Sequence, residues 1–183
     1  MEIKYEKATE KDAYAIRYIG AHSWKETYKG LVSDEYLNYK VEHFEDGIEK
    51  QKKILQNENN NFYIAKVDDK TVGFVSYGNY EDEKYKEYGH IGALYLLKDY
   101  QGYGIGRELF KIALEGLKEL GYTKMELECM TGNSTVNFYK KYLGEIVDVI
   151  DYPLNGGFSV NADIMIFDIE KSLKIINSNQ IRK

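Results

Sequence analysis

The chain has 183 residues, of which 43% are hydrophobic and 30% charged, a composition typical of one soluble globular domain. Its formal net charge of −5 argues against a nucleic-acid-binding protein, which would need a basic face. Because the sequence has no long apolar run, and its first residues alternate charged and apolar side chains, we expect neither a membrane span nor a signal peptide. The only cysteine, Cys129, cannot form an internal disulfide, which fits a protein of the reducing cytoplasm.

The first third of the chain predicts a strand and two helices. Residues 3–5 alternate apolar and charged side chains, as a strand does. The sequence Thr9-Glu-Lys-Asp12 then has the pattern of a capping box, and it predicts a helix that ends near Gly30. Ser33 is placed to cap a second helix, in which apolar residues recur every three or four positions as far as Ile48.

The rest of the chain predicts a mixed sheet. Residues 62–67 and 71–77 read as a hairpin, and the apolar run 90–97 reads as a central strand covered on both faces. The later elements, in order, are a helix at 102–120, a strand at 123–130, a helix at 133–143 and strands at 145–152 and 160–169. Because strands both alternate with helices and pair as hairpins, we expect one domain over residues 1–170, followed by a C-terminal tail at 171–183.

A glycine-rich turn follows the apolar strand and opens the next helix. In the sequence Gln101-Gly-Tyr-Gly-Ile-Gly-Arg107, backbone N–H groups at a helix N-terminus favour an anion, and glycine lets a phosphate approach closely. A dinucleotide fingerprint counted from Gly102 would need glycine at Arg107, and the Gly-Lys-Ser/Thr of a P-loop is absent. These mismatches disfavour a generic nucleotide-binding domain, whereas a glycine-rich turn without any ligand stays an alternative.

The spacing Gln101-x-x-Gly104-x-Gly106 resembles the pyrophosphate loop of the GNAT superfamily of acyl-CoA N-acyltransferases. The later segment from Asn133 to Tyr139 is similar to a second element of that superfamily, in the expected order. The resemblance implies an α/β fold of mixed α+β character: a single three-layer domain, with a central mixed, splayed sheet of about seven strands flanked by about four helices. One departure is Leu143, which stands where many relatives have glycine.

The resemblance also implies an activity. The chain would be a cytoplasmic N-acetyltransferase that moves an acetyl group from acetyl-CoA to a primary amine of a small molecule or peptide, by direct attack in a ternary complex and without a metal. It implies no nucleic-acid or membrane partner, and it leaves open a homodimer formed through the last strands. The alternative is a non-catalytic module of the same fold that senses acyl-CoA.

Binding residues carry over position by position from the resemblance. The assigned cofactor contacts are Leu94, Tyr95, Leu96, Gln101, Gly102, Tyr103, Gly104, Ile105, Gly106, Arg107, Asn133, Asn137 and Tyr139. The first three would pair their backbone with the pantetheine amides, as an added strand does. Asn133 has helix capping as its alternative role, and Asn137 a solvent-exposed surface position.

Trp24 and Tyr28 are assigned to the acceptor amine. They lie four residues apart near a helix end and therefore share one face of that helix. In the superfamily, the segment that joins the first two helices covers the substrate. A simple helix-packing pair is the alternative.

Acetyl transfer needs a proton acceptor for the amine and a proton donor for the leaving thiolate. Tyr139 is the candidate general acid, because a phenol with an ordinary pKa of about 10 is protonated at neutral pH; its alternative role is packing. Glu128 is the candidate general base. It shares one face of its strand with Glu126, and a solvated or salt-bridged sheet face is the alternative role of both residues. His90 is a weaker candidate, since a single histidine at the start of a strand is more often structural. Cys129 is expected in the core and not as a nucleophile.

Overall fold

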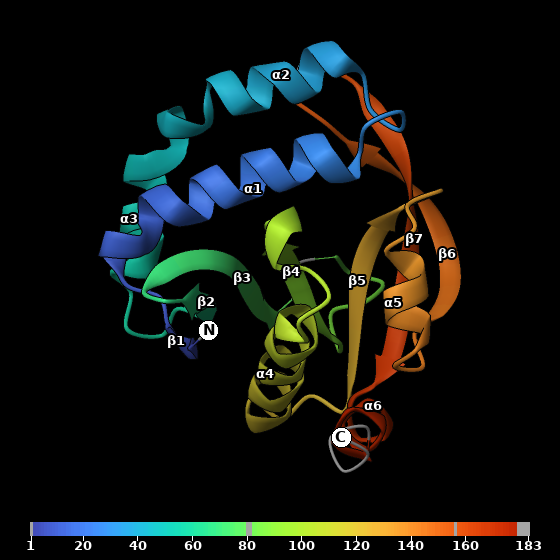
Figure 1. The fold of residues 1–183 in the computed structure, drawn as a ribbon. Helices are drawn as coiled ribbons and strands as arrows, with labels where there is room; N and C mark the ends of the chain where they lie inside the picture. Colours follow the sequence, from blue (N-terminus) through green and yellow to red (C-terminus); the bar gives the residue numbers. More distant parts are fainter. Residues whose placement is uncertain (1, 80–81, 156, 179–183) are drawn as a thin grey trace. The chain divides into compact units, whose positions relative to one another are not determined.

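The computed structural model describes residues 2–79, 82–155 and 157–178 (Figure 1). The strands are β1 (Ile3–Lys7), β2 (Phe62–Val67), β3 (Lys70–Asn79), β4 (Gly89–Leu96), β5 (Lys124–Met130), β6 (Glu145–Pro153) and β7 (Ser159–Asp168). The α-helices are α1 (Ala13–Thr27), α2 (Asp34–Glu42), α3 (Ile48–Leu55), α4 (Ile105–Glu119), α5 (Val136–Lys140) and α6 (Ile169–Ser178). The strands form one mixed sheet in the order β1-β2-β3-β4-β5-β7-β6, which confirms the predicted α/β architecture.

The chain forms two compact units. The first unit comprises Met1–Ser76 and Ala93–Ile112, and the second comprises Tyr77–Gly92 and Ala113–Lys183. Strands β3 and β4 and helix α4 each run from one unit into the other. None of the helices in the part of the chain that the structure describes is both long and apolar enough to cross a bilayer.

The predicted hairpin of the first unit is confirmed as β2 and β3, which pair antiparallel. Asp68 and Asp69 form the turn with φ angles of 47° and 65°. Two consecutive residues with positive φ are the mark of a type I′ turn, whose twist matches that of paired strands. Strand β1 pairs antiparallel with the other side of β2.

Helices cover both faces of these strands. Phe74 on β3 packs with Ile16 and Ile19 of α1 in one buried cluster. The preceding residue, Gly73, points to the opposite face, where a Cβ would lie 3.3 Å from Leu109 Cδ1 of α4. The same Cβ would come within 2.9 Å of the Tyr95 carbonyl oxygen, so only glycine lets β4 and α4 approach this closely. The first unit therefore has three layers.

The second predicted helix begins as expected but ends early. The Ser33 side chain accepts a hydrogen bond from the Tyr36 N–H at 3.3 Å, which confirms the cap. Helix α2 ends at Glu42, and the 3₁₀ turn Phe44–Gly47 separates it from α3, so the prediction of one helix as far as Ile48 was wrong. Arg17 explains the break: its Nε donates to the Phe44 carbonyl at 3.1 Å, and a Cβ at Gly47 would lie 2.5 Å from the Arg17 guanidinium carbon. Figure 1 shows α1 and α2 side by side.

Three helical boundaries in the later chain also differ from the prediction. Helix α5 is much shorter than 133–143 because the Asn133 side chain accepts a bond from the Thr135 N–H at 2.9 Å and so caps a turn ahead of the helix. Leu143 has a φ of 67°, which ends that segment. Residues 171–178 of the predicted tail belong to α6, whose Leu173 and Ile176 are buried, while 179–183 lie outside the described residues. The described chain thus has six α-helices in place of about four.

The second unit contains an antiparallel set of β5, β7 and β6. Strand β4 joins it in parallel, at two residue pairs only among the described residues: Gly89 with Met125 and His90 with Glu126. This short ladder, at the N-terminal end of β4, agrees with the predicted splay of the sheet. It also brings His90 beside β5.

Candidate active site

The glycine-rich turn of the first unit lies between β4 and α4. Gly102 and Gly104 have φ angles of 84° and 83°, a conformation that other residues rarely adopt. The sequence had predicted a helix that starts at 102. Because of these angles, the helix begins at Ile105 instead. The first N–H groups of a helix have no acceptor within it, and here the Glu108 N–H is bonded to the Gly104 carbonyl at 3.1 Å. The preceding N–H groups are therefore available at the positive end of a 15-residue helix.

The side chains around this turn fit an anionic ligand. A Cβ at Gly102 would meet no heavy atom within 4 Å, so the space above the turn is open. Arg107 Nε is buried and has no hydrogen-bond partner within the described part of the chain. Its Nη2 lies 3.7 Å from the position that a Cβ of Gly104 would take, so the guanidinium group lies against the turn. Gln101 Nε2 donates to the Leu96 carbonyl at 3.3 Å and ties the turn to β4. A diphosphate is the kind of group that these donors would hold.

The aromatic pair predicted for the acceptor meets β4 in the first unit. Trp24 Nε1 donates to the Tyr95 hydroxyl at 2.7 Å. The Tyr28 ring packs edge-on against Trp24 at 4.8 Å between centroids, and the Tyr36 ring of α2 lies 6.2 Å away. Lys40, one turn after Tyr36, places its ammonium nitrogen 4.1 Å from the centre of the Trp24 ring. Sequence reasoning missed Tyr36 and Lys40, although their spacing of four on a predicted helix puts them on one face.

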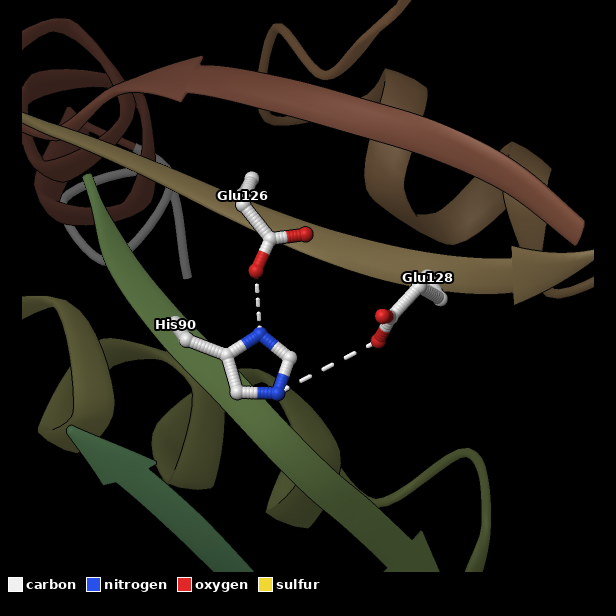
Figure 2. A group of neighbouring side chains, drawn as sticks. All are labelled: His90, Glu126 and Glu128. Carbon is white, nitrogen blue, oxygen red and sulfur yellow. Dashed lines mark hydrogen bonds and ion pairs between the residues drawn. The ribbon is translucent and has the colours of Figure 1, made fainter. Parts of the chain in front are cut away.

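A histidine lies between two carboxyl groups in the second unit. Figure 2 shows the imidazole of His90, on β4, between Glu126 and Glu128 on β5. Its Nδ1 is hydrogen-bonded to Glu126 Oε1, and its Nε2 lies 4.0 Å from Glu128 Oε2. The parallel register of His90 with Glu126 puts all three side chains on the same face. The structure thus brings together the two base candidates, and it adds Glu126, which sequence reasoning had assigned only to a solvated or salt-bridged face.

Glu126 is the most buried member of this group, with 0% of its surface exposed. Burial raises the pKa of its carboxyl, and the hydrogen bond to His90 partly opposes this shift. Its Oε2 has no hydrogen-bond partner among the described residues. One nitrogen, one Glu126 oxygen and one Glu128 oxygen lie within 4.8 Å of one another. The 4.0 Å between His90 Nε2 and Glu128 Oε2 is too long for a direct hydrogen bond, so these two atoms form an ion pair only when the imidazole is protonated.

The remaining cofactor residues of the strand and the glycine-rich turn lie in the first unit, whereas the predicted site residues after α4 lie in the second. Tyr139 on α5 is 7% exposed, and its ring packs edge-on against Phe167 at 6.1 Å. Asn133 is buried and Asn137 is exposed. Burial raises the pKa of the Cys129 thiol to about 11, with a smaller contribution from Asp163. A buried thiol that stays protonated is a poor nucleophile, as expected from the sequence.

Comparison with known proteins identifies the family. The model of the Acetyltransferase (GNAT) family matches residues 24–144. An uncharacterised N-acetyltransferase of Bacillus subtilis strain 168, YuaI, is 28% identical over 147 residues, which cover 79% of this chain and 82% of that protein.

Solved structures show the same fold. The PaiA N-acetyltransferase from Thermoplasma acidophilum, in complex with coenzyme A, superposes with a TM-score of 0.73 at 24% identity, over 92% of this chain and 99% of that chain. YncA from Salmonella typhimurium, with its cofactor acetyl-CoA, superposes with a TM-score of 0.65 at 13% identity, over 92% and 95% of the two chains. The family model covers more than half of the sequence, including the glycine-rich turn and the segment through Tyr139. This chain belongs to the GNAT family of acetyltransferases.

Proposed function

We propose that the protein transfers an acetyl group from acetyl-CoA to the primary amine of a small molecule or peptide, by direct attack in a ternary complex. The observation that carries this proposal is the turn before α4, where Gly102 and Gly104 have positive φ, the space above Gly102 is open, and the buried Arg107 Nε lacks a partner among the described residues. Acetyl-CoA would supply the activated acetyl group. The two relatives with coenzyme A or acetyl-CoA in their structures support this choice of cosubstrate.

In this proposal the first unit binds and orients the cosubstrate. Backbone N–H groups of residues 102–107 and the Arg107 guanidinium hold the diphosphate, since the Gln101 N–H is already bonded to the Lys98 carbonyl at 3.0 Å. The backbone of Leu94, Tyr95 and Leu96 pairs with the pantetheine arm as a neighbouring strand would. Fixing both ends of a long flexible arm places the thioester, and such positioning lowers the entropic barrier of a two-substrate reaction.

The second unit supplies the proton transfers. The attacking amine must lose a proton, and we assign its acceptance to Glu128 together with His90, whose facing atoms are 4.0 Å apart. A water molecule fits a relay of this length better than direct contact does. Glu126 fixes the imidazole orientation through Nδ1, which leaves Nε2 on the side of Glu128. Tyr139 donates a proton to the leaving thiolate.

A panel of amines with acetyl-CoA, followed by release of the coenzyme A thiol, tests this function. A transferase releases thiol only when a suitable amine is present. A module that merely senses acyl-CoA gains thermal stability on binding acetyl-CoA but releases no thiol with any amine. The absence of a thermal shift with acetyl-CoA, in protein shown to be folded, would contradict both possibilities.

The base assignment has its own test. Glu128→Gln keeps the shape of the side chain but removes the basic oxygen, so kcat should fall roughly a hundred- to ten-thousand-fold, the usual contribution of one acid–base group. Affinity for acetyl-CoA should stay unchanged. Glu83→Gln, at an exposed position of the same unit, is the matched control and should have wild-type kcat. A Glu128→Gln variant with wild-type turnover would overturn the assignment.

A further inference from the structure

Lys40 places its ammonium group over two aromatic rings. It lies on α2 and is only half-exposed, with its ammonium nitrogen 4.1 Å above the Trp24 ring and 5.5 Å from the centre of the Tyr36 ring. Aromatic faces attract cations, and the attraction grows as water is removed. The two rings therefore hold the Lys40 ammonium in a fixed place.

Among the described residues, no carboxyl group neutralises this charge. In residues 2–79, 82–155 and 157–178, no ion pair joins Lys40 or the nearby Arg17 to an acidic side chain. Lys66 shows the contrast, since its ammonium group lies 2.5 Å from Glu6 and 4.0 Å from Asp12. The chain has 30 acidic residues against 25 lysines and arginines, so the missing partner does not reflect a shortage of acids.

This arrangement is costly for the free protein. Burial lowers the pKa of Lys40, and the positive charge of Arg17 lowers it further. Taking a charge partly out of water without a counter-ion is unfavourable, and the aromatic faces offset only part of that cost. An anion that arrives from outside would supply the missing partner.

The position of Lys40 connects it with the acceptor. Trp24, whose ring lies under the Lys40 ammonium group, donates a hydrogen bond from Nε1 to the Tyr95 hydroxyl at 2.7 Å. Tyr95 lies in the middle of the strand segment to which the proposed function assigns the pantetheine arm. Two side chains, those of Trp24 and Tyr95, therefore connect Lys40 with the strand backbone assigned to the pantetheine arm, and all of these residues lie within the first unit.

Two kinds of acceptor would interact differently with Lys40. A diamine or polyamine would bring a second positive charge to Lys40 and Arg17, and like charges in a partly dehydrated site repel each other. An amine that also bears a carboxylate gains a charge-assisted hydrogen bond from the same lysine. The positive charges of Lys40 and Arg17 favour the second kind.

We propose that Lys40 binds a carboxylate on the acceptor, so that the substrate is an amino acid or a similar small amine bearing a carboxylate, and not a polyamine. The proposal rests on the proposed acetyl transfer and names its substrate class. Lys40 is then the residue that determines specificity, and Trp24 and Tyr36 hold its ammonium in place.

Trp24 makes the site directly observable because it is the only tryptophan of the chain. The protein saturated with coenzyme A, which cannot turn over, is titrated with amino acids, with the matching amino-acid amides and with 1,4-diaminobutane, and Trp24 fluorescence reports binding. For the amino acid that binds most tightly, the dissociation constant should be roughly ten- to a hundred-fold lower than that of its amide, the range for a hydrogen bond to a charged group.

Variants tie that preference to one side chain. Lys40→Met should abolish the preference of acid over amide, and Lys40→Arg should keep it. Lys40→Glu should reverse it and favour 1,4-diaminobutane. Lys53→Met is the matched control, because it removes the same charge from an exposed position in the same unit and should leave every dissociation constant unchanged. Melting temperatures of all four variants confirm that each is folded.

The outcomes separate this inference from the proposed function. Equal binding of acids and amides, tighter binding of the diamine, or no change on Lys40→Met would overturn the Lys40 proposal, even if coenzyme A release shows that amines are acetylated. Selective binding of acids without any coenzyme A release would support the anion site and overturn the transferase proposal.

Discussion

Replacing Leu143 with glycine should destabilise the protein less than the same substitution at a leucine with ordinary backbone angles, because the change also relieves backbone strain. Leu143 has a φ of 67° and is 45% exposed. An L-residue in the left-handed region costs about 1–2 kcal/mol. Glycine avoids that cost but loses about 0.5–1 kcal/mol through the greater freedom of the unfolded chain. The backbone terms alone therefore favour the variant by up to about 1.5 kcal/mol.

Leu120 provides a matched control. It is 54% exposed and sits at the end of α4, where its N–H is bonded to the Gly116 carbonyl at 3.0 Å. Its φ is not in the left-handed region, so glycine brings no relief there and costs about 1 kcal/mol. Because both leucines are about half-exposed, the apolar burial lost is similar in the two variants and cancels in the comparison.

Urea unfolding of the two variants measures the difference directly. We expect Leu143→Gly to exceed Leu120→Gly in the free energy of unfolding by roughly 1–2 kcal/mol, the size of the strain that is relieved. Equal destabilisation by both substitutions would refute the reasoning. The result also bears on the candidate site, because the Gly144 N–H next to Leu143 is bonded to the Tyr139 carbonyl at 3.2 Å.

Three further predictions concern the site itself. Burial raises the pKa of Glu126 above its ordinary value of 4.5, so the folded state binds a proton more tightly, and the stability due to this group is lost as pH rises through the folded pKa. The glutamine of Glu126→Gln cannot titrate, so the variant should gain stability relative to wild type as pH rises from 4.5 towards neutrality. Urea unfolding measures this difference, and a variant that becomes less stable relative to wild type over this range would contradict the predicted direction of the pKa shift. Tyr139→Phe keeps the ring against Phe167 and should lower kcat roughly ten- to a thousand-fold with unchanged affinity for acetyl-CoA, whereas wild-type turnover on a confirmed substrate would leave the hydroxyl without a catalytic role. Arg107→Met should weaken coenzyme A binding roughly ten- to a hundred-fold in a calorimetric titration, and Lys118→Met, an equal charge change at the exposed end of the same helix, should not; equal affinities would remove Arg107 from the diphosphate site.

The features that sequence reasoning predicted correctly depend on residues close together in the chain. The capping box is one case, with the Thr9 N–H bonded to an Asp12 carboxyl oxygen at 2.9 Å. The β2–β3 turn is another, because two adjacent aspartates tolerate positive φ. The glycine spacing before α4 predicted a turn with open space above it, since residues without Cβ allow it wherever the turn lies.

Tertiary structure decided the features in which distant segments meet. The second helix is broken at Gly47 because Arg17, thirty residues earlier in the chain, bonds to a carbonyl of the intervening turn, and no local pattern contains that contact. Local propensity favoured a continuous helix, and a long-range hydrogen bond outweighed it.

The two candidate clusters follow the same rule. Trp24 and Lys40 come from different helices, and only the packing of α1 beside α2 puts the ammonium over the ring. His90 and Glu126 are 36 residues apart, and only the parallel register of β4 with β5 makes them partners. The sequence alone determined the local turns, because each turn depends on the backbone preferences of a few neighbouring residues. Which titratable groups share a dehydrated space depends on strand register and helix packing, and these are set by the free energy of the whole fold.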